Sequence, residues 1–509
     1  MATHIIVGGG VAGLAAALTL AERGERPLLI EADAHIGGRL RDNDPTRFAH
    51  DGREWQFPAE HGVHGLWQPY VNLLGLLERH GIRPDLQPSL EEGWIMLRGA
   101  RVRRCAVGSA IRESPLPAPF HYLSLFLRPS FLTMLDIGDI IALPRIFGML
   151  LVAMAYDPLA EQTTLAGQTM ADLTRGWPHA LRDFFSALLR SGLAAHPEHV
   201  PAAGYVAFLR FYTLLRRDAW RFRYLRGTGG EQIAQPMASR LAAIGGTVAR
   251  GTVTELAQTD GGWRVSFTQS GVAQTAEAGQ LIVATDAASA ERLLRGSAAT
   301  AALAADLDFP RSMPTAICRL WFDKQPRSGP ASGIISGDVL VDNFFWLDRL
   351  QPAFSAWRDA TGGCAAELHI YGPPEALAQE DVAILAQASS DAMRAFPELR
   401  GALVHAALQR NAASHTVLSI AEPARALGVE TPWPGLYCCG DWVAHPNPAL
   451  YLERAATTGI ASANAALAAR GRDGVPLLPH PEPEPLAGAM MRGMRRLRRA
   501  VVLRATRGP

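Results

Sequence analysis

The stretch THIIVGGGVAGLAAALTLAERGERPLLIE, residues 3–31, decides the fold. A short apolar run leads into Gly8, Gly10 and Gly13 at GxGxxG spacing, and a helical pattern then covers residues 11–23. In a dinucleotide site, Gly8 permits the tight turn from strand to helix. Gly10 lets the backbone approach a pyrophosphate, and Gly13 allows close packing of helix on strand. The stretch therefore predicts a βαβ unit that binds a dinucleotide.

Two further features of this stretch support the same site. Val11 and Ala12 open the predicted helix, where free N–H groups and the positive end of the helix dipole favour phosphate. The second apolar run, residues 27–30, stops on Glu31, which lies where a carboxylate can accept hydrogen bonds from ribose hydroxyls; Ala32 follows it. Strand, glycines, helix, strand and acid occur in order, which a chance glycine-rich turn would not reproduce.

Composition describes a folded protein of ordinary charge. The 509 residues allow two to four domains, and 48% of them are apolar against 19% charged. The mean hydropathy is +0.04. A net charge of +1 argues against a nucleic-acid partner.

The cysteine pattern indicates a reducing compartment. The five cysteines include the adjacent pair Cys438-Cys439, but none forms a CxxC motif, so neither a disulfide framework nor a metal site is expected. The sequence begins directly with the nucleotide-binding strand, which leaves no room for a signal peptide. We therefore expect a cytoplasmic protein.

A second strong motif lies near the C-terminus. Residues 434–443 read as a buried strand that ends in Gly440-Asp441, and a helical pattern follows over residues 449–467. Earlier, GGR at residues 37–39 would bring Gly38 and the guanidinium of Arg39 to a pyrophosphate, where the guanidinium can bind two oxygens. Both ends of the chain are thus expected to contribute to one site.

The order of elements predicts an α/β (α+β overall) fold in two interleaved domains. A discontinuous Rossmann-type nucleotide domain would take residues 1–95, 225–300 and 405–470. A substrate domain of mixed sheet plus helices would take residues 96–224 and 301–404, with a hairpin at residues 91–104 and strands near residues 313–323, 339–347 and 366–371. Residues 471–509 form a proline-rich linker and a basic tail.

The run EHGVHGLWQPYVNLLGLLERHGI, residues 60–82, resembles a motif of flavin-dependent carotenoid desaturases. GDWV at 440–443 and LERAATTG at 452–459 are most similar to the β-ring desaturase/methyltransferases of that family, the isorenieratene synthase type. The resemblance implies FAD as cofactor and a lipophilic isoprenoid as substrate. It also implies hydride transfer to flavin N5 and a quinone or O2 as electron acceptor.

The resemblance also implies roles for particular residues. Val253 would offer backbone groups to the adenine, and Asp441 would lie beside the ribityl and phosphate chain. The start of the last helix, at Ala449 and Leu450, would point its dipole at the flavin ring.

Few catalytic side chains are expected, because the flavin would carry the chemistry. Glu60 and Glu453 are candidates for assisting a cationic rearrangement, and His61 or His64 for taking the proton. Spacing alone favours the interpretation of the two histidines as ordinary core or turn residues, since nothing pairs them with a metal-ligand set.

Two segments suggest contact with a membrane. Residues 131–155 are strongly apolar, but charges and Pro144 interrupt them, so no stretch reaches the length of a spanning helix and a buried or interfacial helix is expected. The tail MMRGMRRLRRAVVLRATRG reads as a basic amphipathic helix or as a disordered basic tail. We expect a peripheral protein on the inner face of the membrane.

Two rival interpretations remain open. A flavin amine oxidase shares the expected fold but needs a pocket for a polar amine, usually with an aromatic cage. Rab escort and GDP-dissociation-inhibitor proteins also resemble this fold and bind prenyl chains without flavin. The intact glycines of the N-terminal motif, together with Glu31, Gly440 and Asp441, argue against the second rival.

Overall fold

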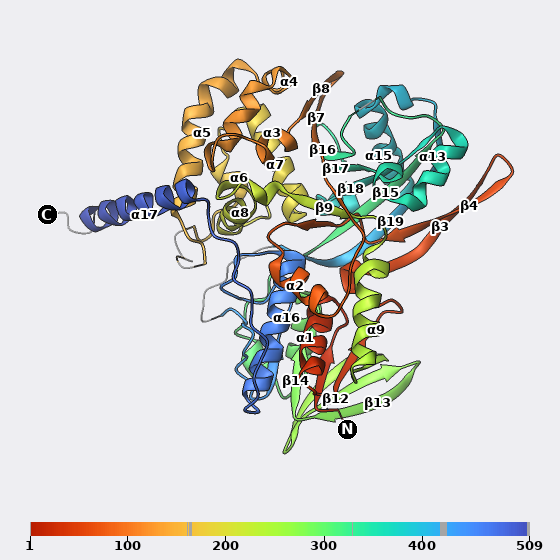
Figure 1. The fold of residues 1–509 in the computed structure, drawn as a ribbon, viewed down its shortest axis with the longest axis vertical. Coiled ribbons are helices and arrows are strands. Elements are labelled where there is room, and N and C mark those ends of the chain that lie inside the picture. Colours follow the sequence, from red (N-terminus) through yellow and green to blue (C-terminus); the bar gives the residue numbers. More distant parts are fainter. Residues whose placement is uncertain (1, 160, 162–164, 328, 418–424, 506–509) are drawn as a thin grey trace.

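The computed structural model describes residues 2–159, 161, 165–327, 329–417 and 425–505, with side chains as far as Arg498. Two sheets organise the molecule. One lies with the N-terminus in the lower half of Figure 1, and the other lies above it beside a group of helices. The expected mixed α/β fold with a parallel Rossmann-like sheet is confirmed.

The lower sheet has five parallel strands in the order β10-β2-β1-β14-β20. Their bounds are Thr247–Arg250, Pro27–Glu31, His4–Val7, Gln280–Val283 and Leu436–Cys438. Strand β1 is central and buried along its whole length, as the unbroken apolar run predicts for a strand covered on both faces. Strands from both ends of the chain meet here, so the N-terminal and C-terminal motifs lie in one domain.

Helix α1 (Val11–Glu22) packs on helix α16 (Tyr451–Ala468) against this sheet (Figure 1). The contact depends on Gly459, where a Cβ would lie 2.4 Å from the Ala12 carbonyl oxygen and 2.9 Å from Ala15 Cβ. Helix α9 (Gln235–Ala243) also contacts α1. The remaining elements of this half are α2 (Val71–Arg79), α10 (Ala287–Gly296), α11 (Ala301–Ala304) and the antiparallel strands β11 (Thr252–Thr259), β12 (Gly262–Gln269) and β13 (Val272–Ala278).

The upper sheet has seven strands in the order β19-β15-β18-β17-β16-β7-β8. Their bounds are Leu403–Thr416, Ser312–Phe322, Cys364–Ile370, Asn343–Trp346, Ser332–Gly337, Glu92–Arg98 and Arg101–Ala106. Helices α12 (Leu347–Leu350), α13 (Ser355–Thr361), α14 (Pro374–Leu377) and α15 (Asp381–Ala395) accompany it. Its strand β18 is fully buried, so this sheet carries the core of the second domain.

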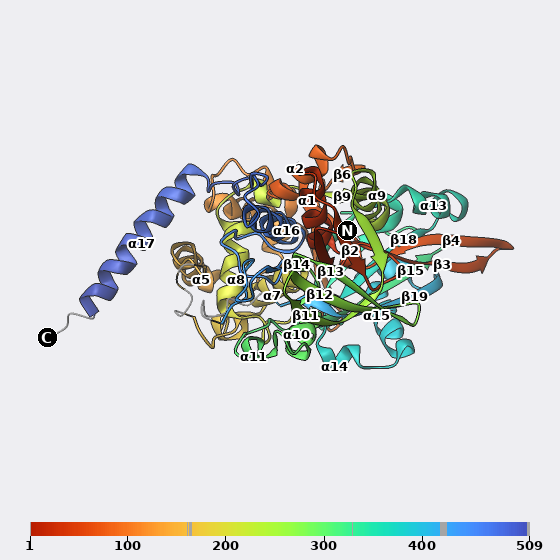
Figure 2. The same cartoon turned by 90° about the horizontal axis from the view of Figure 1, so that it is seen from below.

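Two smaller sheets complete the fold. A hairpin of β3 (Asp42–His50) and β4 (Arg53–Glu60) projects from the molecule, most clearly in Figure 2. Strands β5 (Gly65–Trp67), β9 (Phe222–Leu225) and β6 (Leu86–Pro88) pair in that order. They lead the chain from the nucleotide domain into the second domain and back again.

The structure corrects the expected domain boundaries at residues 95 and 405. The hairpin near residues 91–104 forms, but its first strand, β7, pairs with β16, and β19 pairs with β15 over most of its length. Both strands therefore belong to the upper sheet and not to the nucleotide domain. Their apolar patterns suit either sheet, so only the pairing decides the boundary.

The helical insert holds α3 (Gly108–Arg112), α4 (Pro129–Leu132), α5 (Ile137–Ala155), α6 (Met170–Leu173), α7 (His179–Leu193) and α8 (Ala202–Leu209). Helix α17 (Pro485–Ala505) lies against α5 and projects from the body (Figures 1 and 2). The basic tail is thus helical in the structure. Three arginines of this tail cannot be described in full. The side chains of Arg499 and Arg504 are not among the described side chains, and Arg507 lies outside the described residues.

Of the two alternatives expected for residues 131–155, a buried or an interfacial helix, helix α5 does not fit the buried one. It is also long enough to cross a membrane, which is not expected from the sequence. It runs unbroken for 19 residues through Pro144 and, by length and composition, could cross a membrane. A core helix of a soluble protein can have the same length and composition, but such a helix is mostly buried. Only 17% of the most apolar 18-residue segment of α5 is buried. Ile137 is 77% exposed and Ile141 75% exposed, so α5 presents apolar side chains outward.

Candidate dinucleotide and substrate site

The turn between β1 and α1 has the geometry that the glycine pattern predicts. Gly8 adopts φ +107°, which favours glycine. A Cβ on Gly13 would lie 1.9 Å from the Gly8 carbonyl oxygen, so helix and turn touch there. Gly10, Val11 and Ala12 line a cavity of about 830 Å³, and the first N–H groups of α1 have no acceptor within the helix. The turn therefore presents backbone donors to the cavity.

Glu31 lies at the end of β2 and lines the same cavity. Its Oε2 accepts a 2.6 Å hydrogen bond from the Gly9 N–H, and its Oε1 accepts a 2.7 Å bond from the Asp33 N–H. A carboxylate has about four acceptor positions, so lone pairs remain for ribose hydroxyls. Ala32 lines the cavity beside it. The acid both holds the glycine turn and faces the space where a ribose would lie.

The GGR segment, residues 37–39, contacts both the N-terminal glycine turn and the C-terminal Gly440-Asp441 motif. The Gly37 N–H donates to the Gly9 carbonyl at 2.9 Å, and a Cβ on Gly38, at φ +59°, would lie 3.2 Å from Gly10 Cα. Arg39 Nη2 lies 2.7 Å from Asp441 Oδ2, whose side chain is 4% exposed. Gly37, Gly38, Arg39 and Asp441 all line the cavity. A guanidinium and a carboxylate from distant motifs thus form one ion pair at its wall.

Further residues at the carboxyl ends of the strands complete this end of the cavity. Val253 and Gly440 line it, as expected for a site built from three separate segments. Asp286, Ser289 and Arg292 also line it and were not predicted. They follow strand β14 directly, and Asp286 caps α10 through a 3.0 Å bond from the Ser289 N–H. Their place after a buried parallel strand is the sequence signal that could have found them.

The other end of the cavity is aromatic and holds several imidazoles. Its lining residues include His61, His64, Trp67, Tyr70, Phe208, Tyr212, Thr315, Ile317, His369, Tyr371, His415 and Tyr451. Burial lowers the pKa of His415 to about 3. Burial, with smaller contributions from His64 and Arg39, also holds the pKa of His61 well below its usual range. These two rings are therefore neutral at physiological pH and leave this end of the cavity without their charge.

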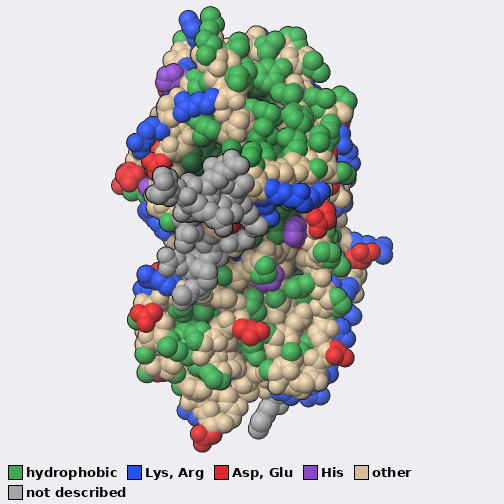
Figure 3. Space-filling view, turned by 90° about the vertical axis from the view of Figure 1, so that its left-hand side faces the viewer, with side chains coloured by type: hydrophobic (Ala, Val, Ile, Leu, Met, Phe, Trp, Pro, Cys, Tyr) green, Lys and Arg blue, Asp and Glu red, His purple; other side chains and the backbone are tan. Residues whose placement is uncertain are grey.

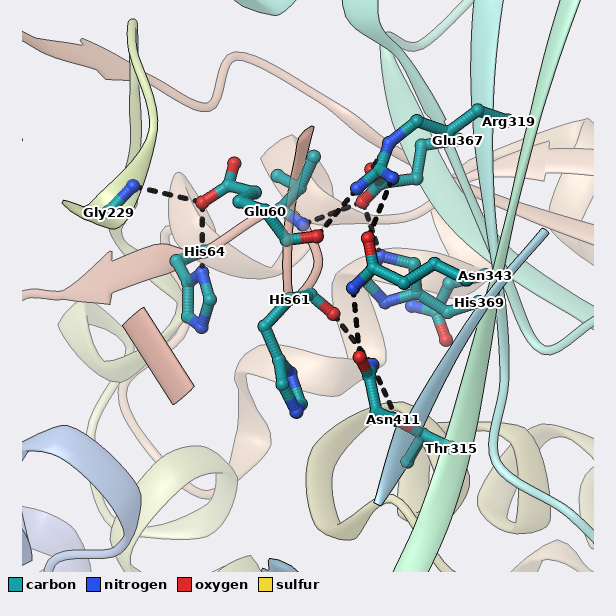
Figure 4. Close-up of polar contacts among 12 residues, drawn as sticks. Glu60, His61, His64, Gly229, Thr315, Arg319, Asn343, Glu367, His369 and Asn411 are labelled. Carbon is teal, nitrogen blue, oxygen red and sulfur yellow. Dashed lines mark hydrogen bonds and ion pairs between the residues drawn. The ribbon is translucent and has the colours of Figure 1, made fainter. Parts of the chain in front are cut away.

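The structure corrects the two carboxylates proposed for catalysis. Glu453 is fully buried, and its oxygens accept bonds from the N–H groups of Asn72 and Leu73 at the start of α2. Glu60 accepts from the Gly229 N–H (Figure 4) and also from Gln351 Nε2. Neither is among the described residues that line the cavity. Both stabilise contacts between elements, which their sequence position does not reveal.

The structure also corrects the expected positions of Ala449 and Leu450 at the cofactor. Ala449 and Leu450 are buried and, among the described residues, are not part of the cavity lining; Tyr451 and Leu452 line it instead. Tyr451 adopts φ +52°, a left-handed conformation that is rare for a bulky residue. Arg454 donates to the carbonyls of Ala449, Val443 and Asn447 and holds the preceding loop in place. Helix α16 thus meets the cavity one to two residues later than predicted.

Together the fold and the site define a class of protein. It binds an adenine dinucleotide along a parallel sheet and faces the reactive end with a second domain. The chain matches the model of the flavin containing amine oxidoreductase family over residues 11–467 and belongs to that family. It is therefore a flavin-dependent oxidoreductase, and FAD is its cofactor.

Two curated relatives cover most of the chain. The carotenoid phi-ring synthase of Streptomyces griseus is 27% identical over 473 residues, which are 91% of this chain and 87% of the relative. The carotenoid phi-ring synthase of Chlorobaculum tepidum is 22% identical and covers 91% of this chain and 88% of its own. A probable zeta-carotene desaturase of Synechococcus elongatus is 30% identical over 26% of this chain and 24% of its own. The expected likeness to carotenoid desaturases is confirmed.

Solved structures confirm the fold. Cyclohexylamine oxidase from Brevibacterium oxydans superposes with a TM-score of 0.64 at 16% identity, covering 92% of this chain and all of that one. An oxidoreductase from Methanosarcina mazei gives 0.60 at 16% identity, covering 90% and 99%.

The residues present fit FAD. The glycine turn leaves open space at Gly10, where the nearest atom to an added Cβ would be Gly38 Cα at 4.0 Å. That space continues past Arg39 and Glu31 to the aromatic end without leaving the cavity. Backbone donors and a guanidinium suit a pyrophosphate, and the carboxylate suits a ribose. These residues would hold the adenine half, with the flavin ring toward Tyr451.

Proposed function

We propose that the protein oxidises a carotenoid or a related isoprenoid hydrocarbon by desaturation, including β-ring desaturation with methyl migration. One observation carries the proposal. Among the described residues, the acids that line the cavity are Glu31, Asp33, Asp286 and Asp441. Asp441 is the one that lies near Tyr451 and His415, and its charge is already paired with Arg39 at 2.7 Å. A hydrocarbon needs no counter-charge, whereas an amine cation does. The two phi-ring synthase relatives support the same substrate class.

A flavin amine oxidase remains the rival, and the aromatic lining favours it. Tyr371, Tyr451 and Phe208 all line the cavity and could surround an amine through their ring faces. Bound FAD supplies a hydride acceptor at N5 in either case. The protein's own contribution is a cavity that excludes water and fixes one carbon beside that acceptor. Under the proposal a quinone or O2 would serve as the electron acceptor.

Expression in pigment-producing bacteria tests the substrate directly. In hosts that accumulate acyclic or β-ring carotenoids, we expect the chain to convert one of them into a product with more double bonds. A Gly13→Ala variant in the same hosts controls for effects of expression. Unchanged pigments in every host, with the protein present and loaded with FAD, would count against a carotenoid substrate.

We further propose that the protein works at the inner face of a membrane, where such a substrate dissolves. Exposed apolar side chains gather over the helical insert (Figure 3). They are Leu116, Leu123, Leu127, Leu132, Ile137, Ile140, Ile141 and Val152. Helix α17 lies against α5 and carries Arg492 and Arg496, both exposed. The apolar side chains would enter the bilayer, and the arginines beside them would contact anionic lipid headgroups.

Charged substitutions on α5 should weaken binding to lipid. We expect Ile137→Asp/Ile141→Asp to lose at least about tenfold in affinity for anionic vesicles in a flotation assay, because each buried side chain is worth about 1.5–3 kcal/mol. Val272→Asp/Val382→Asp is the matched control, since these valines are 58% and 74% exposed on other surfaces. Equal binding by both double variants would contradict the assignment of this surface.

A further inference from the structure

Three side chains form a hydrogen-bonded row in the wall of the cavity. Tyr371 and His369 line the cavity. His369 Nδ1 lies 2.7 Å from the Tyr371 hydroxyl, and its Nε2 lies 2.7 Å from Glu367 Oε1. Arg319 Nε donates to Glu367 Oε2 at 2.8 Å behind them (Figure 4). The row leads from the cavity to a buried ion pair.

The partners determine which atoms carry protons. Burial alone would raise the pKa of Glu367, but Arg319, His369 and the Val63 N–H outweigh it and lower that pKa to about 2. Glu367 is therefore an acceptor only, so His369 Nε2 must carry the hydrogen. Nδ1 is then a free lone pair and accepts from the Tyr371 hydroxyl. Burial raises the pKa of Tyr371 above its usual range, so the phenol is protonated.

The row is fixed in place by its surroundings. A Cβ on Gly62 would lie 3.1 Å from His369 Cε1, so only glycine leaves room for the imidazole. The Phe345 ring lies 4.7 Å from it on the sheet. The Tyr371 N–H donates to Asp342 Oδ2 at 2.7 Å. A side chain with both ring nitrogens engaged and no room to turn is positioned for one task.

We propose that Tyr371 removes the proton in the desaturation, with His369 and Glu367 as the groups that position and charge-balance it; this rests on the proposed function. After the hydride has left for the flavin, the neighbouring C–H bond breaks and its electrons form the new π bond. The Tyr371 oxygen takes that proton while its own proton passes to His369 Nδ1. The imidazolium that results is paired with the Glu367 carboxylate. The substrate has then lost one hydride and one proton.

The charges that face the row suit this direction of transfer. Glu367 lies against His369, and Asp342 bonds the Tyr371 backbone; each carboxylate is paired with an arginine, Arg319 and Arg190 respectively. The net charge of these two pairs is zero, so one added positive charge on His369 is tolerated beside Glu367.

The test compares Tyr371→Phe and His369→Gln with the wild type in the FAD-loaded protein, with a carotenoid supplied in vesicles. We expect kcat to fall about 10²–10³-fold, the range for a lost acid–base group, with KM changed less than about threefold. Tyr224→Phe is the matched control, because it deletes a buried hydroxyl bonded to Ser332 Oγ at 2.7 Å outside the described cavity lining; it should keep the wild-type kcat.

A second readout does not depend on turnover. In ¹⁵N-histidine NMR of the FAD-loaded protein, the signal lost in His369→Gln should show the Nε2–H tautomer, and its Nδ1 resonance should shift in Tyr371→Phe. An Nδ1–H tautomer, or wild-type kcat in Tyr371→Phe, would overturn the relay while carotenoid oxidation by the wild type stands. A wild type that oxidises no carotenoid would instead refute the proposed function, and the proton-transfer role with it.

Discussion

Replacing Gly13 with alanine is expected to weaken FAD binding by about 10–100-fold. The added Cβ would lie 1.9 Å from the Gly8 carbonyl oxygen and 3.2 Å from Ala284 Cβ. Helix α1 would have to move away from the turn, which carries its N–H groups out of line with the pyrophosphate. Overpacking of this kind costs about 1–3 kcal/mol, and each 1.4 kcal/mol is a factor of ten in affinity. Titration of the apoprotein with FAD measures the change.

Gly148→Ala is the matched control for this substitution. Gly148 also lies in a helix, α5, but a Cβ there would meet nothing within 4 Å. Alanine is the better helix former by about 1 kcal/mol, so we expect unchanged FAD affinity and equal or higher stability. Wild-type FAD affinity in Gly13→Ala would contradict the assignment of this turn to the cofactor.

Replacing Arg319 with leucine is expected to destabilise the protein by about 3–5 kcal/mol, the cost of leaving a buried charge without its partner. The side chains of Arg319 and Glu367 are 4% and 1% exposed. Arg319 also donates to the Glu60 carbonyl and to Gln409 Oε1, so these two acceptors would lose a hydrogen bond in the variant. Chemical denaturation at neutral pH measures the loss.

The pH dependence of this loss follows from Glu367. Its pKa of about 2 in the folded protein lies below the ordinary value of 4.5, so the ion pair stabilises the protein fully above about pH 4.5. That contribution is lost as the pH falls toward 2, and the deficit of Arg319→Leu should shrink over the same range. Arg264→Leu, in an exposed pair with Glu277, should cost under about 1 kcal/mol. Equal losses in both variants would contradict the burial argument.

Local patterns allowed much of the nucleotide domain to be predicted. A glycine turn, an apolar strand and a terminal acid act within about thirty residues, and the contacts of Gly8, Gly13 and Glu31 in the structure are the ones that such a turn requires. The domain boundaries could not be predicted, because β7 and β19 have strand patterns that suit either sheet. A local sequence pattern does not determine which distant strands pair with each other.

The far wall of the cavity was missed for a related reason. Glu367, His369 and Tyr371 stand two residues apart in AELHIY, so strand periodicity puts them on one face. That alternation is a visible signal. Their significance, however, depends on Arg319 from the neighbouring strand and on the cavity beside them. Conversely, Glu453 is a candidate in the sequence because a carboxylate could assist a cationic rearrangement, yet in the structure it accepts hydrogen bonds at the start of another helix.

Anaerobic reduction of the bound flavin by candidate substrates tests the central claim most directly. The purified protein, loaded with FAD, is mixed without oxygen with vesicles that contain an acyclic or a β-ring carotenoid, and separately with cyclohexylamine and putrescine. We predict that the oxidised flavin absorbance bleaches with a carotenoid and persists with the amines. Bleaching by an amine, with no response to any carotenoid, would contradict the account.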